Sequence, residues 1–150
     1  IFEMEFILIK INCSFMSLFV RYDSLKNPNS IVIGGRFIMD YKDVIGRKVH
    51  VIMDRPAGSY HPRNHDIYYP INYGYIEDVI APDGSGQDVY VLGKEEPLET
   101  FDGIVIAVFH RTNDIEDKWI AAPEGVDFTD EEILKSIHFV EQFFEGYLCR

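Results

Sequence analysis

The chain of 150 residues has few cysteines, and this shortage limits where the protein can work. The two cysteines, Cys13 and Cys149, lie near opposite ends of the chain, without the spacing of a metal site or a redox motif. A secreted fold built on disulfides normally uses more cysteines, whereas proteins of the reducing cytoplasm manage without disulfides. We therefore predict a cytoplasmic location.

Basic residues are also scarce. The chain has 14 Lys and Arg against 25 Asp and Glu, which leaves a formal net charge of -11. Binding to nucleic acid depends mainly on Lys and Arg side chains that neutralise phosphates, and no basic stripe compensates for the acidic balance. We therefore predict no nucleic-acid partner.

Long apolar runs are absent as well. No uninterrupted apolar span is long enough to cross a bilayer. Two short apolar runs, at residues 6–9 and 15–20, could pass for a signal sequence, but Glu3 and Glu5 precede the first run, and Lys10 and Asn12 separate it from the second. We predict neither secretion nor a membrane partner.

The first 38 residues differ in composition from the remainder of the chain. Gly34 and Gly35 stand five and four residues before Met39, and a bacterial ribosome-binding sequence GGAGG, read in frame, would encode such a glycine pair. Our hypothesis is that residues 1–38 are a non-native or disordered extension and that residues 39–150 form the working domain.

What the chain has in abundance is apolar and aromatic material, with 47% hydrophobic residues, enough for the core of one compact domain. Residues 47–54 and 87–92 alternate between apolar and polar side chains, as strands do, and residues 103–109 are apolar on both faces, which indicates a buried central strand. A capping box at residues 129–132 then opens an amphipathic helix. This order predicts a mainly β fold with α, a β-barrel followed by a C-terminal amphipathic helix.

The most informative stretch runs from Tyr69 to Leu92. An aromatic segment, Tyr-Pro-x-Asn-Tyr-Gly-Tyr, is followed by an acidic glycine turn that begins at Asp83 and reaches Asp88 at the start of the next strand. Two carboxylates placed in this way can converge on a hard cation such as Mg²⁺, although Asp-Gly alone is also ordinary turn chemistry. An EF-hand is excluded, because Asp88 stands where its glycine belongs and Lys94 where its bidentate glutamate belongs.

This arrangement resembles the soluble family I inorganic pyrophosphatases. The resemblance extends more loosely from about Val49 to Phe143. It includes a strand that ends in an acid before a proline, at residues 51–56, and a Lys-x-Ile-Ala-Ala-Pro segment at residues 118–123. It implies an OB-like five-stranded β-barrel with a C-terminal helix. It also implies Mg²⁺-dependent hydrolysis of inorganic pyrophosphate by a metal-activated water, with Mn²⁺ as an alternative metal. The related bacterial enzymes are homo-oligomers, which this shorter chain need not be.

The resemblance also implies the roles of particular residues. The metal ligands would be carboxylates, namely Asp54, Asp83, Asp88, Asp114 and Glu116. The catalytic residues would be Asp88, Lys118 and Tyr73, and the residues that hold the small phosphate substrate would be Arg63, Tyr73 and Lys118. Two of these assignments leave alternatives. The loop after residue 111 is shorter than in the family, so Asp117 could replace a neighbouring acid as a ligand. The loop at residues 59–66 could instead bind zinc through His61 and His65, but no third ligand stands at a recognisable spacing, which favours an ordinary polar loop.

Two departures from the family pattern bear on activity. Ser85 stands where the family has the aspartate thought to take a proton from the attacking water, and a hydroxyl cannot replace a carboxylate as general base near neutral pH. Phe143 and Phe144 stand where the family has a Tyr-Lys pair that holds phosphate. A catalytically weak or inactive module that binds a metal with phosphate or a nucleotide is therefore the alternative. In a third interpretation the acidic residues only make the surface of an interaction domain soluble.

Overall fold

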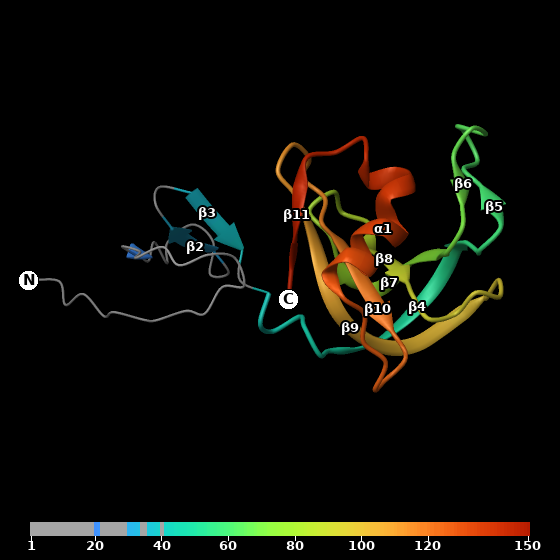
Figure 1. Cartoon of the computed structure of the whole chain (residues 1–150), viewed down its shortest axis with the longest axis horizontal. Coiled ribbons are helices and arrows are strands. Elements are labelled where there is room, and N and C mark those ends of the chain that lie inside the picture. Colours follow the sequence, from blue (N-terminus) through green and yellow to red (C-terminus); the bar gives the residue numbers. More distant parts are fainter. Residues whose placement is uncertain (1–19, 22–29, 34–35, 40) are drawn as a thin grey trace, which may run out of the picture. The chain divides into compact units, whose positions relative to one another are not determined.

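The computed structural model describes residues 20–21, 30–33, 36–39 and 41–150, and the chain divides into two units between residues 40 and 41 (Figure 1). The first unit contains a three-stranded antiparallel sheet, with strands β1 (Val20–Arg21), β2 (Ser30–Ile33) and β3 (Arg36–Met39). The hypothesis that residues 1–38 are an extension falls mostly on residues outside the described ranges, so it stays a prediction.

The second unit is built on a β-sheet that closes on itself. Its strands follow the order β10-β8-β7-β4-β9, and an additional pairing of β10 with β9 closes the ring. The five strands are β4 (Lys48–Arg55), β7 (Asn72–Ile80), β8 (Gly86–Val91), β9 (Thr100–Arg111) and β10 (Lys118–Ala122). The predicted five-stranded OB-like barrel is therefore confirmed.

Two further features extend the barrel. The strands β5 (Ser59–Tyr60) and β6 (Tyr68–Tyr69) form a small hairpin between β4 and β7, which stands out from the barrel in Figure 1. The strand β11 (Gly146–Cys149) pairs in antiparallel fashion with the C-terminal part of β9, residues 108–111. We did not predict β11 from the sequence, because four residues after a helix show too little alternation to indicate a strand.

The barrel strands contribute alternate side chains to two apolar clusters, since successive residues of a strand point to opposite faces. On β8, Val89 and Val91 belong to one cluster, while Tyr90 belongs to the other. The cluster with Tyr90 also contains Ile133 and Ile137 of the helix. One face of the barrel wall is therefore buried under the helix.

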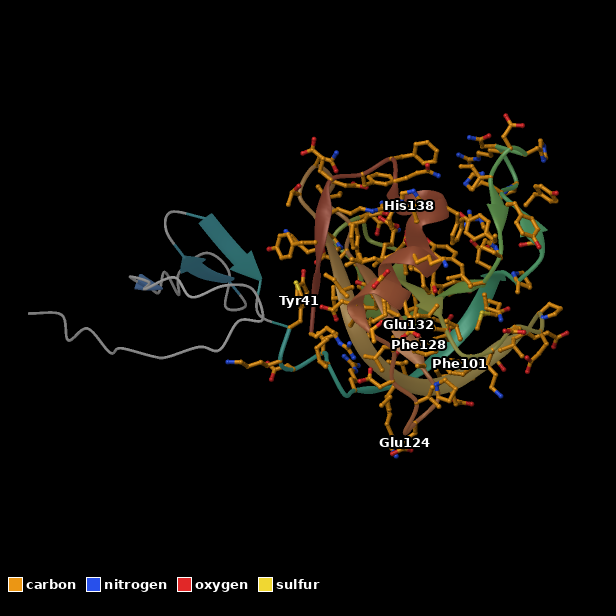
Figure 2. The ribbon with its side chains drawn as sticks, in the orientation of Figure 1. Tyr41, Phe101, Glu124, Phe128, Glu132 and His138 are labelled. Carbon is orange, nitrogen blue, oxygen red and sulfur yellow. The ribbon has the colours of Figure 1, made fainter. Side chains whose placement is uncertain are left out.

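The helix, α1 (Asp130–Glu141), begins where the sequence predicts. The Thr129 side chain accepts a hydrogen bond from the backbone N–H of Glu132, and the Glu132 carboxylate accepts one from the backbone N–H of Thr129. Figure 2 shows Glu132 near the start of the helix and His138 near its end. This reciprocal capping satisfies two backbone donors that a helix start otherwise leaves unpaired. No helix in the described part of the chain is long and apolar enough to span a membrane.

Candidate functional site

A pocket of about 750 Å³ opens beside the helix-covered face of the barrel. Its lining comes from segments far apart in the sequence: the end of β4, the β5–β6 loop, the β7–β8 turn, the hairpin between β9 and β10, and the residues after α1. Of the predicted site residues, six line this pocket: Asp54, Tyr73, Asp83, Asp88, Glu116 and Lys118. The tertiary structure therefore brings most of the predicted site together.

Strand register explains this convergence. In the antiparallel pair of β7 and β8, Tyr75 lies opposite Asp88 and Tyr73 lies opposite Tyr90. Residues opposite one another in a sheet project to the same face, and residues two apart along a strand do so too. Asp88 thus projects to the same face as Tyr73 and Tyr90, at the edge of the cluster that packs under α1.

Lys118 lies at the centre of the charged wall of the pocket. Its side chain is only 5% exposed, and its ammonium group donates hydrogen bonds to Asp88, to Glu116 at 2.8 Å and to the Tyr73 hydroxyl at 3.3 Å. These three bonds use all the donors of an ammonium group. Lys118 must therefore exchange one of these partners before it can bind a phosphate oxygen.

Tyr73 is the buried neighbour of this ion pair. Burial raises the pKa of its hydroxyl above the usual range, and the charge and hydrogen bond of Asp88 raise it further. The hydroxyl therefore stays protonated near neutral pH. In that form it can donate a hydrogen bond to a phosphate oxygen or to a leaving group.

The β7–β8 turn places Asp83 and Ser85 on the pocket wall. The backbone N–H of Ser85 donates a 3.0 Å hydrogen bond to the Asp83 carboxylate, and this bond holds the pKa of Asp83 below its usual value. Gly84 adopts φ of +87°, a left-handed conformation that suits glycine. Asp83 is therefore ionised and available as an oxygen ligand at neutral pH.

Arg55 is a pocket residue that we did not single out in the sequence. It follows Asp54 on β4 and pairs in register with Tyr73, so its guanidinium lies 5.3 Å from the centre of the Tyr73 ring and 5.4 Å from that of Tyr69. Its Nη1 contacts the Asp54 carboxylate at 3.0 Å, while its buried Nε has no hydrogen-bond partner among the residues that the structure describes. The sequence pattern of an acid before a proline did not indicate a role for Arg55, because the residue between Asp54 and Pro56 belongs to no motif of its own.

Arg111 and Glu141 form a second buried ion pair that we did not predict. The Arg111 Nε and Nη2 donate to the two Glu141 carboxylate oxygens at 2.8 Å, and both side chains are 4% exposed. Glu141 also accepts a 2.6 Å hydrogen bond from the Tyr90 hydroxyl, and Arg111 Nη1 donates to Asp114 at 2.9 Å. This network joins the last turn of α1 to the hairpin after β9.

Two predicted site residues do not line the pocket. Arg63 is exposed in the β5–β6 loop, whose residues His61 and Asn64 line the pocket instead. Asp114 is not among the lining residues, and its carboxylate accepts a hydrogen bond from Arg111. Burial acts to raise the pKa of Asp114, but its hydrogen bonds to Arg111 and to backbone N–H groups outweigh burial and lower this pKa below its usual value. Asp117, the alternative ligand, instead contacts His110 at 2.8 Å and does not line the pocket.

The pocket carboxylates are of the kind that a hard divalent cation prefers, since Mg²⁺ takes oxygen ligands. Within the described ranges, however, no group of three or more His, Cys, Asp or Glu side chains is already gathered as a metal site. The Lys118 ammonium is already paired with two of the pocket carboxylates, Asp88 and Glu116. The donor set fits Mg²⁺ in chemistry, but a bound metal would have to compete with this internal cation.

Comparisons with known proteins give a result at the level of structure. No protein-family model and no curated protein sequence matches the chain. Among solved structures, the inorganic pyrophosphatase of Ehrlichia chaffeensis matches with a TM-score of 0.55 at 19% identity, over 70% of this chain and 86% of that one. The Helicobacter pylori inorganic pyrophosphatase matches with a TM-score of 0.51 at 17% identity, over 67% of this chain and 83% of that one.

A third solved structure agrees with these two. An inorganic phosphatase from Anaplasma phagocytophilum matches with a TM-score of 0.50 at 21% identity, over 71% of this chain and 86% of that one. All three likenesses cover most of the other chain, so they concern a whole domain rather than a shared motif. The barrel, its C-terminal helix and these comparisons together establish that the chain has the fold of the inorganic pyrophosphatases.

Proposed function

We propose that the protein hydrolyses inorganic pyrophosphate to two phosphates in a reaction that depends on Mg²⁺. One observation carries the proposal: Asp54, Asp83, Asp88, Glu116 and Lys118 come from separate strands and turns and line one pocket. Acidic residues that served only to make the surface soluble would lie apart from one another rather than line one pocket. The fold shared with the inorganic pyrophosphatases supports the same activity.

The charge balance of the pocket supports a role for divalent cations. Four carboxylates line the pocket, and Asp114 and Glu141 are bound to the lining residue Arg111, so acids outnumber the three basic side chains Arg55, Arg111 and Lys118. A polyanionic substrate would be repelled by this cluster unless cations were bound. Asp83, Asp88, Glu116 and Asp54 would hold Mg²⁺, with Asp114 nearby. Bound Mg²⁺ would lower the pKa of a coordinated water and neutralise phosphate oxygens.

The chain's own residues then have distinct tasks. Arg55 and Lys118 bind and orient the phosphates, and the Tyr73 hydroxyl donates to the leaving phosphate. Asp88, or another of the acids on the pocket wall, takes the proton of the attacking water, since Ser85 cannot. Water adds to one phosphorus, the bond from that phosphorus to the bridging oxygen breaks, and the second phosphate leaves.

A phosphate-release assay tests this function. We expect the full chain to release phosphate from pyrophosphate with Mg²⁺ and to lose this activity when the metal is chelated. Asp88→Asn should lower the rate about a hundredfold or more, because both a ligand and a proton acceptor are lost. The matched control is Asp78→Asn, at an exposed position outside the pocket, which should leave the rate unchanged. Equal loss in both variants, or no release by the full chain, would contradict the proposal.

The second candidate function is a module that binds a metal with phosphate but hydrolyses no substrate. Ser85 favours this candidate, because its hydroxyl cannot replace a carboxylate as general base. The variant Ser85→Asp separates the two. If only the base is missing, restoring a carboxylate should raise hydrolysis by roughly a hundredfold or more. Titration calorimetry with pyrophosphate and Mg²⁺ provides the other measurement: binding without phosphate release, in both the natural chain and the Ser85→Asp variant, would favour the module.

A further inference from the structure

The residues that line the pocket fall into two chemically different groups. The charged group, which we call the charged wall, includes Asp54, Arg55, Asp88 and Lys118 and suits phosphates. The apolar group, which we call the apolar wall, consists of Ile67 from the β5–β6 loop together with Val140, Phe143 and Phe144 at and beyond the end of α1. An inorganic diphosphate has no apolar surface to place against the apolar group. The volume of about 750 Å³ also lies in the range of about 300–1,000 Å³ that is typical of sites for organic ligands.

The two phenylalanines of the apolar wall differ in what they contact. The Arg111 guanidinium lies 3.4 Å from the centre of the Phe144 ring, so this ring is held by the ion pair with Glu141. Phe143, in contrast, is 66% exposed at the pocket, and the described part of the chain offers its ring no aromatic or cationic partner. Phe144 therefore has a structural role, and Phe143 presents an unused aromatic face.

The β5–β6 loop, which supplies Ile67, also brings a polar side chain, His61, to the pocket lining. His61 Nδ1 accepts hydrogen bonds from the backbone N–H groups of Arg63 at 3.2 Å and Asn64 at 3.0 Å. A ring nitrogen that accepts in this way carries no proton, so in the neutral ring the proton resides on Nε2. Desolvation and the charges of Arg55 and Arg63 lower the pKa of His61, which favours this neutral form. His61 can therefore donate one hydrogen bond into the pocket from Nε2.

On these grounds, and resting on the proposed function, we infer that the site takes nucleoside diphosphates, with the phosphates at the charged wall and the base stacked on Phe143. His61 Nε2–H donates to a ribose or base acceptor. A base-tolerant aromatic platform is suited to any nucleoside, because every base has a π-face. Water adds to the terminal phosphorus, the bond from that phosphorus to the bridging oxygen breaks, and nucleoside monophosphate, phosphate and one proton are released. No electron donor or acceptor is needed.

The experiment compares three probes on the full chain with Mg²⁺: ADP, methyl diphosphate and inorganic pyrophosphate. Methyl diphosphate has the phosphates of ADP without the base. We expect ADP to bind at least about tenfold more tightly than methyl diphosphate, and Phe143→Ala to remove this advantage, since base stacking on one aromatic side chain is worth roughly tenfold or more. The full natural chain and the Phe143→Ala variant should bind and hydrolyse pyrophosphate equally. Because Phe143 is exposed, its loss should not impair folding.

The matched control is Tyr60→Ala, which removes an aromatic ring that is 58% exposed and lies outside the pocket lining. It should leave the preference for ADP unchanged. Hydrolysis of pyrophosphate with no preference for ADP over methyl diphosphate would overturn the nucleotide inference and leave the proposed function standing. A preference for ADP that depends on Phe143, without release of phosphate from any probe, would uphold the nucleotide site and overturn the proposed hydrolysis.

Discussion

At the scale of single residues, the Arg111–Glu141 ion pair has the strongest consequences for stability. Both partners are buried, and their carboxylate and guanidinium groups satisfy one another with good geometry. Removing one partner of such a pair leaves an uncompensated buried charge. We therefore expect Glu141→Gln to lower the free energy of unfolding by about 3–5 kcal/mol, measured by urea denaturation.

The measurement can follow Trp119, the one tryptophan of the chain, which is buried in the barrel. The control is the exposed pair of Lys48 and Glu124, 3.5 Å apart, with Glu124 labelled in Figure 2. Glu124→Gln should change the free energy of unfolding by less than about 1 kcal/mol, because exposed ion pairs contribute little. A similar small change in Glu141→Gln would show that the buried pair does not hold α1 on the barrel.

The residue scale also shows where sequence reasoning succeeded and where it could not. Asp83 and Asp88 belong to a local motif, so their place in one site could be predicted, and both line the pocket. Arg111 and Glu141 are 30 residues apart and belong to no motif. Their pairing depends on how α1 packs on β9, and nothing local in the sequence indicates it. Arg63 was predicted to hold phosphate only because it stands where the family has a phosphate-binding lysine. Its side chain is exposed and does not line the pocket.

At the scale of secondary-structure elements, the close approach of β4 and β7 positions the pocket. Gly74 lies opposite Met53 in this pair, and a Cβ atom at Gly74 would come within 2.0 Å of the Ile52 carbonyl oxygen. Backbone cannot move aside as a flexible side chain can. We expect Gly74→Ala to destabilise the protein by about 3 kcal/mol, at the upper end of overpacking effects.

The same substitution should also disturb the site, because Arg55 and Tyr73 lie in the adjoining part of this strand pair. The control is Gly125→Ala, in a loop where a Cβ would meet nothing within 4 Å and where the φ of +81° is the sole strain. Its cost should be about 1–2 kcal/mol. Urea denaturation and phosphate release measure both effects. Equal costs at Gly74 and Gly125 would contradict a penalty from the close approach of β4 and β7.

At the scale of the whole molecule, the division of the chain between residues 40 and 41 leads to a test of the domain hypothesis. The barrel, α1, β11 and the pocket all lie within residues 41–150. We expect the shortened chain Met39–Arg150 to unfold in one cooperative transition. Its free energy of unfolding should lie within about 1 kcal/mol of that of the full chain, because the whole barrel, α1 and β11 lie within the shortened chain.

Circular dichroism and the fluorescence of Trp119 follow this transition. Phosphate release by the shortened chain should equal that of the full chain. A broad transition, or a loss of activity on removal of residues 1–38, would contradict the division. Mass spectrometry of the native protein complements this test, because peptides from residues 12–30 in cell extracts would show that the first segment is part of the natural protein.

The sequence by itself determined the local features of this protein: the alternation of the strands, the capped start of α1, the acidic turn at Asp83 and the shortage of basic charge. These depend on residues close together in the chain. The tertiary structure alone decided which of the charged side chains meet, that Lys118 lies between Asp88 and Glu116, and that Phe143 is left uncovered at the pocket. Those relations arise from strand register and helix packing, which join residues that no local pattern connects.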